Sequence, residues 1–275
     1  MNAGYNLNFH QTFAPEREYL SKLLELADGT TPMTKEDIFE RTGIPTGKQS
    51  GKVEPHIAYA VYMGLLEDTA DGATHKLTRT ELGESVYSND PHLLEPLTLL
   101  VCHYNLSSPP SGAALWQFIF QKAVAGLGQS VPQKSLGNAA SVEFPGIRVG
   151  LTPVKTCYTT EKCLGLLGLL DVTPDKTWVF SPVTYQSDYR HAYSYTLLKT
   201  WDEVLPNRKE VTLDEVLTDL HWSRPFLWGE RETWYILDSL NDLGLIALNK
   251  QLTPITLIRR STCSAALSSM YSNLL

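Results

Sequence analysis

The chain has 275 residues, 43% of them hydrophobic and 10% aromatic, which is enough to bury a core and excludes disordered, collagen-like and low-complexity classes. Its 23 Lys and Arg against 30 Asp and Glu give a net charge of -7, so any contact with nucleic acid must be a local patch. No stretch approaches the roughly 20 apolar residues of a membrane helix, and the start lacks a signal-peptide pattern, so we expect a soluble, cytoplasmic protein without a membrane partner.

Three segments share one predicted order of elements: a short amphipathic helix, a turn, a longer helix, and a strand-turn-strand. In each segment a glycine ends the longer helix and two large aliphatic residues follow it, at Gly64, Gly168 and Gly244. Glycine adopts the left-handed conformation that closes a helix, and the chain then leaves as a buried strand. This order predicts tandem winged-helix-like units. The uneven spacing of the three glycines is not that of a solenoid.

In the first unit, residues 34 to 37 form a capping box that opens a short helix through about Arg41. A turn over 43–47 follows, and the apolar spacing predicts a helix from about residue 54 to 63. Short strands end near Leu77-Thr78, before a helix from Glu81.

The second unit is predicted over about 135–182, with a helix from Thr152 to Leu167 and strands over 169–172 and 178–180. The third begins at a capping box over 212–215 and ends in strands over 246–248 and 252–257.

The connecting segments read as helices with wide apolar faces, over 17–27, 91–104, 112–126 and 185–205. We therefore predict a mainly α fold of tandem winged-helix-like units bridged by packed helices. The expected domains are an N-terminal unit over 1–106, a central unit over 107–184 and a C-terminal unit over 185–275.

The stretch Phe9-His10-Gln11-Thr12-Phe13, continued by Tyr19-Leu20-Ser21-Lys22, resembles a bacterial family known only as a domain of unknown function. Its members begin with a His-x-Thr-Phe motif, here His10, Thr12 and Phe13, and the resemblance spans most of residues 9–120. Glu16 stands where the family usually has an arginine, and Arg17 comes one residue later. Genes of this family lie beside DNA phosphorothioation and other phage-defence operons, so the resemblance implies a role linked to DNA.

Polar residues at the start of the first unit's longer helix are candidate DNA contacts. The loop before them is no phosphate-binding loop, because its glycines are wrongly spaced and no strand precedes it. A helix N-terminus favours phosphate, and side chains there reach base edges, so the predicted contacts are Lys48, Gln49, Ser50, Lys52 and His56. The alternative is a solvated polar loop.

The second unit adds Lys155 and Lys162 as candidate DNA contacts. In the third unit, Arg224 and Arg231 are offset by Glu230 and Glu232, which cancels the attraction for phosphate. That unit is instead rich in aromatic residues, and Trp222, Phe226 and Trp228 are candidate anchors for a protein partner, although such residues are mostly core.

Histidines and cysteines give no catalytic or metal pattern. His10 lies between two phenylalanines, which favours a core or capping role. The four cysteines, Cys102, Cys157, Cys163 and Cys263, show no C-x-x-C pair and no zinc spacing, so we expect reduced thiols, with no metal and no cofactor.

The sequence therefore favours a non-catalytic subunit that binds duplex DNA within a bacterial DNA-modification or phage-defence system. The alternative is an adaptor that binds other proteins of such a system without contacting DNA. No nucleophile elbow, two-metal acidic cluster or dinucleotide fingerprint supports an enzyme.

Overall fold

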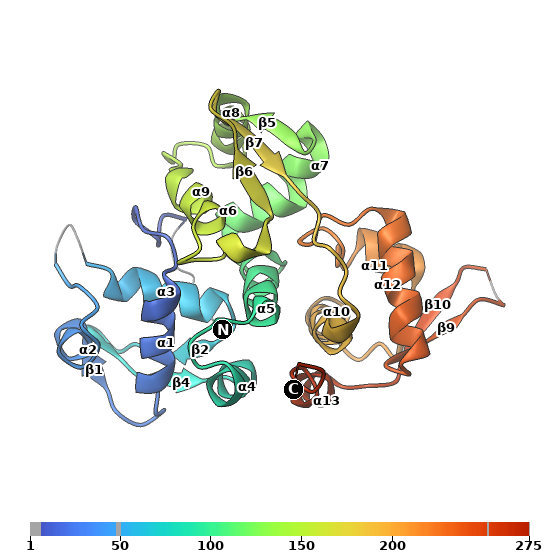
Figure 1. Ribbon diagram of the computed structural model, residues 1–275, viewed down its shortest axis with the longest axis horizontal. Coiled ribbons are helices and arrows are strands. Elements are labelled where there is room, and N and C mark those ends of the chain that lie inside the picture. The colour runs from blue at the N-terminus through green and yellow to red at the C-terminus, as the bar shows by residue number, and fades with distance from the viewer. Residues whose placement is uncertain (1–6, 48–50, 252, 275) are drawn as a thin grey trace.

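The computed structural model describes residues 7–47, 51–251 and 253–274. Across these ranges about 48% of the chain is helical, and the strands form small antiparallel sheets. In Figure 1 three groups of elements surround helix α5 (Pro96–Ser107). We call them the first unit (17–89, blue to cyan), the second unit (114–180, green to yellow) and the third unit (190–259, gold to red). Within the described ranges, no helix is both long and apolar enough to cross a membrane.

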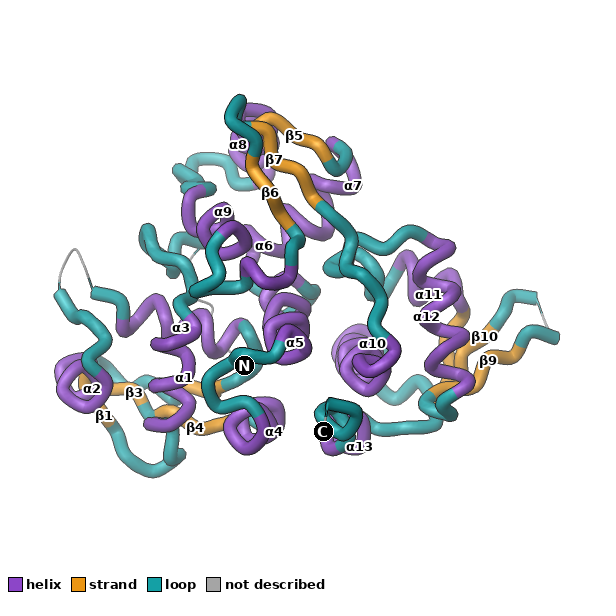
Figure 2. The backbone as a smooth tube through the Cα atoms, viewed as in Figure 1, coloured by secondary structure: helices purple, strands orange, loops and turns teal. Residues whose placement is uncertain are grey.

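The first unit places its helices over two pairs of short strands (Figure 2). Strand β1 pairs with β3, and β2 pairs with β4. The capping box is confirmed, because the backbone N–H of Asp37 donates to Thr34 Oγ1 at 3.2 Å and the Asp37 carboxylate accepts from the Thr34 N–H at 2.8 Å. The elements are α1 (Arg17–Leu26), β1 (Met33–Thr34), α2 (Lys35–Thr42), α3 (Val53–Tyr62), β2 (Leu66–Asp68), β3 (Thr74–His75), β4 (Leu77–Arg79) and α4 (Glu81–Asn89).

The second unit carries a three-stranded sheet in the order β5-β7-β6. The predicted helix from Thr152 to Leu167 is wrong beyond Thr159. There the chain turns back, the Leu164 N–H donates to the Cys157 carbonyl, and the side chains of Cys163 and Leu164 are buried. Its elements are α6 (Ala114–Gln117), the π-helix η1 (Phe118–Ala123), α7 (Val124–Leu127), β5 (Ser130–Pro132), α8 (Gln133–Glu143), α9 (Thr152–Thr159), the 3-10 turn η2 (Gly165–Leu167), β6 (Leu170–Val172) and β7 (Thr177–Phe180).

The third unit repeats this arrangement with strand order β8-β10-β9. Its capping box at Thr212 and Glu215 is confirmed. The last strand begins at Thr256, later than the predicted 252, and Leu252 lies outside the described residues. The 3-10 turn η3 (Ser187–Tyr189) precedes the unit and α13 (Cys263–Ser268) follows it. Its elements are α10 (Arg190–Val204), β8 (Glu210–Thr212), α11 (Leu213–Thr218), α12 (Glu230–Asp242), β9 (Ile246–Asn249) and β10 (Thr256–Arg259).

All three units thus run helix, strand, helix, helix and a final antiparallel strand pair. The predicted glycine exits at Gly64 and Gly244 are confirmed, with φ of 74° and 73°. Gly168 is also left-handed, with φ of 62°, but it closes the 3-10 turn η2, because the longer helix of its unit ends at Thr159. Gly64 also has no room for a side chain, because a Cβ there would lie 2.8 Å from Asn105 Nδ2. Helix α8 lies where the shared order of elements places the short helix of the second unit, whose start is expected at about residue 135. The sequence did not predict the short strands β1, β5 and β8.

Helix α5 joins the units because it is buried on every side from Leu97 to Ser107. One face packs into the core shared by the first and second units, and Leu100 and Tyr104 pack into the core of the third. The helix begins at Pro96, later than the predicted residue 91, because the Asp90 carboxylate accepts from the backbone N–H groups of Leu94 and Glu95 and holds the preceding turn.

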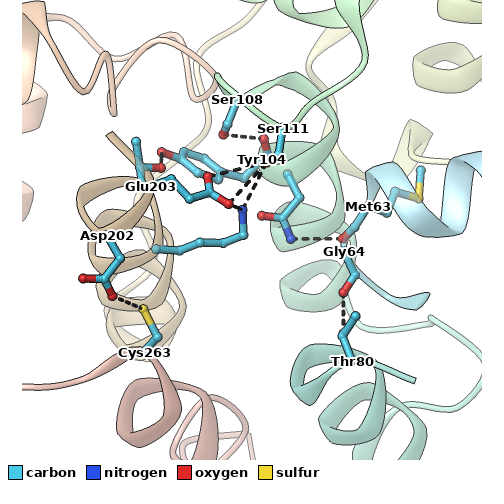
Figure 3. A network of polar contacts seen from close by, with 12 residues as sticks. Met63, Gly64, Thr80, Tyr104, Ser108, Ser111, Asp202, Glu203 and Cys263 are labelled. Atoms are coloured by element: carbon cyan, nitrogen blue, oxygen red, sulfur yellow. Dashed lines mark hydrogen bonds and ion pairs between the residues drawn. The ribbon is translucent and has the colours of Figure 1, made fainter. Parts of the chain in front are cut away.

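Polar contacts connect α5 with its neighbours. Figure 3 shows Tyr104 of α5 and Ser111, in the loop after this helix, close to Glu203 of α10. The Tyr104 hydroxyl lies 2.7 Å from Thr200 Oγ1, and Asn105 Nδ2 donates to the Met63 carbonyl of the first unit at 3.0 Å. Burial of these groups is therefore compensated by hydrogen bonds across the junction.

His103 on α5 contacts both the second and the third unit. Its Nε2 lies 2.7 Å from the carbonyl oxygen of Pro225, and its Nδ1 lies 2.7 Å from the Tyr158 hydroxyl on α9. A carbonyl only accepts, so Nε2 carries the proton and Nδ1 accepts from Tyr158. The neutral ring therefore links the second unit to the third through α5.

Two buried histidines predict acid sensitivity. Burial lowers the pKa of both His56 and His103 to about 4 from an ordinary value of 6.5. Between these values the unfolded chain binds more protons than the folded chain, so the free energy of unfolding rises with pH and is lost as pH falls from about 6.5 to 4. Each histidine contributes roughly 3 kcal/mol to this loss.

Urea unfolding at pH values across this window measures the effect. We expect His56→Gln to make the free energy of unfolding depend less steeply on pH, over the same pH range of about 4 to 6.5. The exposed His92→Gln is the control and should keep the wild-type slope. A free energy of unfolding that stays constant across the window would contradict the assignment of two buried neutral rings.

Candidate nucleic-acid interface

Of the predicted DNA contacts of the first unit, Lys52 and His56 lie within the described residues. Lys48, Gln49 and Ser50 lie outside the described residues. Lys52 is half-buried: its Nζ pairs with Glu16 Oε1 at 2.5 Å and lies 5.1 Å from the centroid of the Tyr19 ring. Glu16 already pairs with this ammonium group, so Lys52 would have to exchange that ion pair to bind phosphate.

His56 also differs from its prediction. Its side chain is fully buried, with Nδ1 at 2.7 Å from the Lys52 carbonyl and Nε2 accepting from the Glu16 backbone N–H at 3.1 Å. Eight of the ten residues of α3 are buried, because α1 packs over this helix. The expectation that His56 faces a DNA groove is therefore wrong.

The aromatic residues predicted to anchor a partner form the core of the third unit. Trp222 and Phe226 are fully buried and Trp228 is 6% exposed. The Phe226 and Trp228 rings stack at 4.1 Å, Trp222 Nε1 donates to Thr196 Oγ1, and Trp228 Nε1 donates to the Val183 carbonyl. These side chains have their partners inside the chain and offer no docking surface.

The family motif also packs inward. His10 is buried, its Nδ1 lies 2.8 Å from the Gln11 carbonyl, and burial lowers its pKa. The Phe13 carbonyl accepts from the Tyr59 hydroxyl at 2.9 Å, and Thr12 is exposed. The core position expected for His10 is thus observed.

A cavity of about 470 Å³ lies along α1, next to the motif. Three basic residues, Arg17, Lys22 and Lys162, line it together with three glutamates. Arg17 donates to the carbonyl oxygens of Leu93 and Glu161, so it ties loops together. Because the charges of its lining residues balance, this cavity has no net attraction for a polyanion. Lys162, which the sequence predicts as a DNA contact, is one of these lining residues.

Positive charge exceeds negative charge in one part of the chain. Residues 113–182 contain six Lys and Arg against four Asp and Glu, whereas residues 1–112 contain eight against fifteen and residues 183–275 contain nine against eleven. Residues 113–182 are therefore the segment of this acidic chain in which basic residues outnumber acidic ones.

Within the second unit, helices α8 and α9 begin at one cleft of about 410 Å³. Lys134 at the start of α8, Thr152 at the start of α9, and Lys176 in the hairpin turn line it. Neither helix has a side-chain N-cap, so their N-terminal ends add positive potential. The turn is fixed against α8, since the Gln133 N–H donates to the Lys176 carbonyl at 3.0 Å.

The backbone conformation at position 176 does not favour a lysine. Its φ of 64° is in the left-handed region, where a residue other than glycine costs about 1 kcal/mol. The neighbouring Asp175 is engaged by the hydroxyls of Thr173 and Thr177, and these hydrogen bonds hold its pKa below the ordinary value. The exposed Lys176 ammonium therefore extends from the turn without an acidic partner among the described residues.

We define the lysine cleft by Lys134 and Lys176, which line it, together with Lys155, which is half-buried and is not among the lining residues. Lys155 lies three residues after Thr152, on the same face of α9. In the described part of the chain none of the three lysines takes part in an ion pair. Sequence reasoning found Lys155 and missed Lys134 and Lys176, although a count of charge by segment would have indicated the region.

A family model agrees with the N-terminal resemblance. Residues 8–134 match the family described as protein of unknown function (DUF4007), which is a little under half of the chain. The motifs over residues 9–120 fall inside this match. A search of curated proteins found no match.

Two solved structures show the same fold. A crystal structure of a protein named SspB has a TM-score of 0.72 and 17% identity, and a magnesium-bound SspB structure has a TM-score of 0.72 and 16% identity. Each alignment covers 97% of this chain and 86% of the other. Among the residues described for this chain, no three His, Cys, Asp or Glu side chains are grouped as metal ligands would be.

Proposed function

We propose that this chain is a non-catalytic DNA-binding subunit of a bacterial DNA-modification or phage-defence system, and that its second unit contacts the duplex. The observation that carries the proposal is the lysine cleft: three lysines without ion pairs among the described residues, in the one segment with a surplus of positive charge. Such contacts release counterions from DNA and supply much of the binding free energy.

The order of elements supports a winged-helix interpretation of each unit. In helix-turn-helix proteins the second helix enters the major groove while neighbouring elements contact the backbone. In the second unit this role falls to α9, with Lys155 facing the DNA, Lys134 at the start of α8, and Lys176 in the hairpin turn as a backbone contact. The same helix of the first unit, α3, is buried and has no such role.

The link to DNA modification rests on the resemblance to a family whose genes lie beside phosphorothioation and phage-defence operons. Other proteins of such a system are the expected protein partners. The adaptor alternative rested on the acidic net charge and on the aromatic residues of the third unit, and because Trp222, Phe226 and Trp228 are buried, the second of these features no longer favours it.

Fluorescence anisotropy with a labelled duplex tests the proposal. A surface of three lysines predicts a linear plot of log K against log salt concentration with a slope of about -3. Absence of binding at low salt, or an affinity that does not change with salt, would contradict a phosphate-binding surface.

A further inference from the structure

A cavity of about 270 Å³ lies where the start of α12 meets the segment that joins β7 to η3. Tyr185 of that segment and Tyr235 of α12 line it, and their rings meet at 85° with centroids 5.3 Å apart. The two rings therefore form perpendicular walls. The other apolar lining residues are Val183, Trp228 and Ile236. We call this cavity the tyrosine pocket.

Tyr235 exposes an aromatic ring at a pocket whose other walls are fixed. Its side chain is 60% exposed. Tyr185 stacks on the buried Tyr193 with centroids 5.9 Å apart, and the Val183 carbonyl accepts from Trp228 Nε1 at 2.8 Å. Exposed aromatic residues at preformed pockets are typical anchors of protein interfaces, because little conformational entropy is lost on binding.

A carboxylate without an ion pair also lines the tyrosine pocket. Glu232 is exposed and forms no salt bridge with any described residue. Gly229 leaves room for it, since a Cβ at position 229 would lie 2.8 Å from Glu232 Oε2. Arg231, the residue before Glu232, is the one basic lining residue, and it is exposed.

Helix α12 is acidic along its whole length. Glu230, Glu232, Asp238 and Asp242 oppose the single Arg231. The two glutamates lie in the first turn, where negative charge stabilises a helix. Asp242 lies in the last turn, where negative charge is unfavourable, so helix stability does not explain it. This surface is therefore complementary to a basic partner.

The size and chemistry of the tyrosine pocket select an arginine side chain. Pockets for drug-sized ligands are about 300 Å³ or larger, so this one admits a single side chain and no nucleotide or cofactor. A guanidinium group stacks on aromatic rings and donates to a carboxylate at the same time. The charge of Arg231 opposes this binding, but water and salt screen it at the exposed rim.

We propose that the tyrosine pocket binds an arginine side chain from a basic segment of a partner protein, with the guanidinium group against Tyr185 and Tyr235 and paired with Glu232. These anchors differ from the ones that the sequence predicts, of which Trp222 and Phe226 are fully buried. This inference does not rest on the lysine cleft and goes beyond DNA binding.

Titration of the full chain with blocked tripeptides, followed by NMR of the peptide, tests the inference. The probe has arginine between two glycines, and matched peptides carry lysine or citrulline, which has the shape of arginine without its charge. We expect the arginine peptide to bind with a Kd on the order of 1 mM and the citrulline peptide to bind about fivefold more weakly. The lysine peptide should fall between them. Equal binding of the arginine and citrulline peptides, or no saturation by the arginine peptide, overturns the proposal.

Variants of the two neighbouring charges should have different effects. Glu232→Gln should weaken binding of the arginine peptide about fivefold, whereas Arg231→Gln should not weaken it. Tyr235→Ala, at an exposed position that the fold does not require, should also weaken binding about fivefold. The controls Glu40→Gln and Phe39→Ala remove an exposed carboxylate and an exposed ring from α2 and should change nothing. Weaker binding in Arg231→Gln together with stronger binding in Glu232→Gln would indicate an anionic occupant and overturn the proposal.

A single-stranded oligonucleotide tests the other class of partner, since bases also stack on tyrosine rings. Binding of oligothymidylate that Tyr235→Ala abolishes would assign the pocket to nucleic acid and overturn the proposal, whereas binding that this variant leaves unchanged supports it. Replacing the three lysines of the cleft by glutamine should leave binding of the arginine peptide unchanged. Failure of this inference is therefore distinguishable from failure of the proposed function.

Discussion

Replacing Lys134, Lys155 and Lys176 together by glutamate is expected to weaken duplex binding roughly tenfold to a hundredfold, because each exposed charged contact contributes up to about 1 kcal/mol. The three side chains line or flank one cleft and form no ion pair in the described structure, so their replacement breaks no internal salt bridge. Stability should therefore remain close to that of the wild type. Anisotropy with a labelled duplex measures the affinity.

A matched control carries the same change of charge elsewhere. Lys76, Lys209 and Arg260 lie in the first and third units and near the end of β10, and none forms an ion pair within the described residues. Their triple glutamate variant should lose much less affinity. For the glutamine versions, the slope of log K against log salt should fall by about three units only in the cleft variant. Equal losses in both triple variants would show a general charge effect and no defined site.

Replacing His103 by leucine is expected to lower the free energy of unfolding by about 3 to 5 kcal/mol. The ring is fully buried, and its loss leaves the Tyr158 hydroxyl and the Pro225 carbonyl without their partner. Each unsatisfied buried group costs about 1 to 3 kcal/mol, and the altered shape adds a packing term. Urea unfolding followed by circular dichroism measures the change.

His191→Leu is the matched control for this substitution. His191 is a half-buried residue of α10, and its Nδ1 has no hydrogen-bond partner, so we expect a change within about 1 kcal/mol. If His103→Leu were as stable as the control, the ring would not be the link between the second and third units that the contacts indicate.

Local signals in the sequence predicted the ends of elements well. The capping boxes at Thr34 and Thr212 and the glycines that close helices depend only on residues within a few positions, so a linear pattern contains them. The break after Thr159 depends on the burial of Cys163 and Leu164 in a distant core, and no local pattern announces it.

The candidate site was predicted less well, because exposure is a tertiary property. His56 and Lys52 have a suitable position on their helix, but α1 brings Glu16 and Tyr19 over them. Trp222 and Trp228 are residues of the type that anchors a protein partner, but here their ring N–H groups donate to acceptors within the same chain. Lys134 and Lys176 are 42 residues apart and meet only because the β6–β7 hairpin folds back on the start of α8.

Hydrogen–deuterium exchange of the full chain, with and without a saturating duplex, tests the central claim most directly. We predict slower exchange of backbone amides over 133–137, 152–156 and 173–177, where the two helix starts and the hairpin turn meet the DNA. Residues 53–62 of α3 should exchange at the same rate in both states. Protection confined to the first or third unit, with the second unit unchanged, would contradict the account.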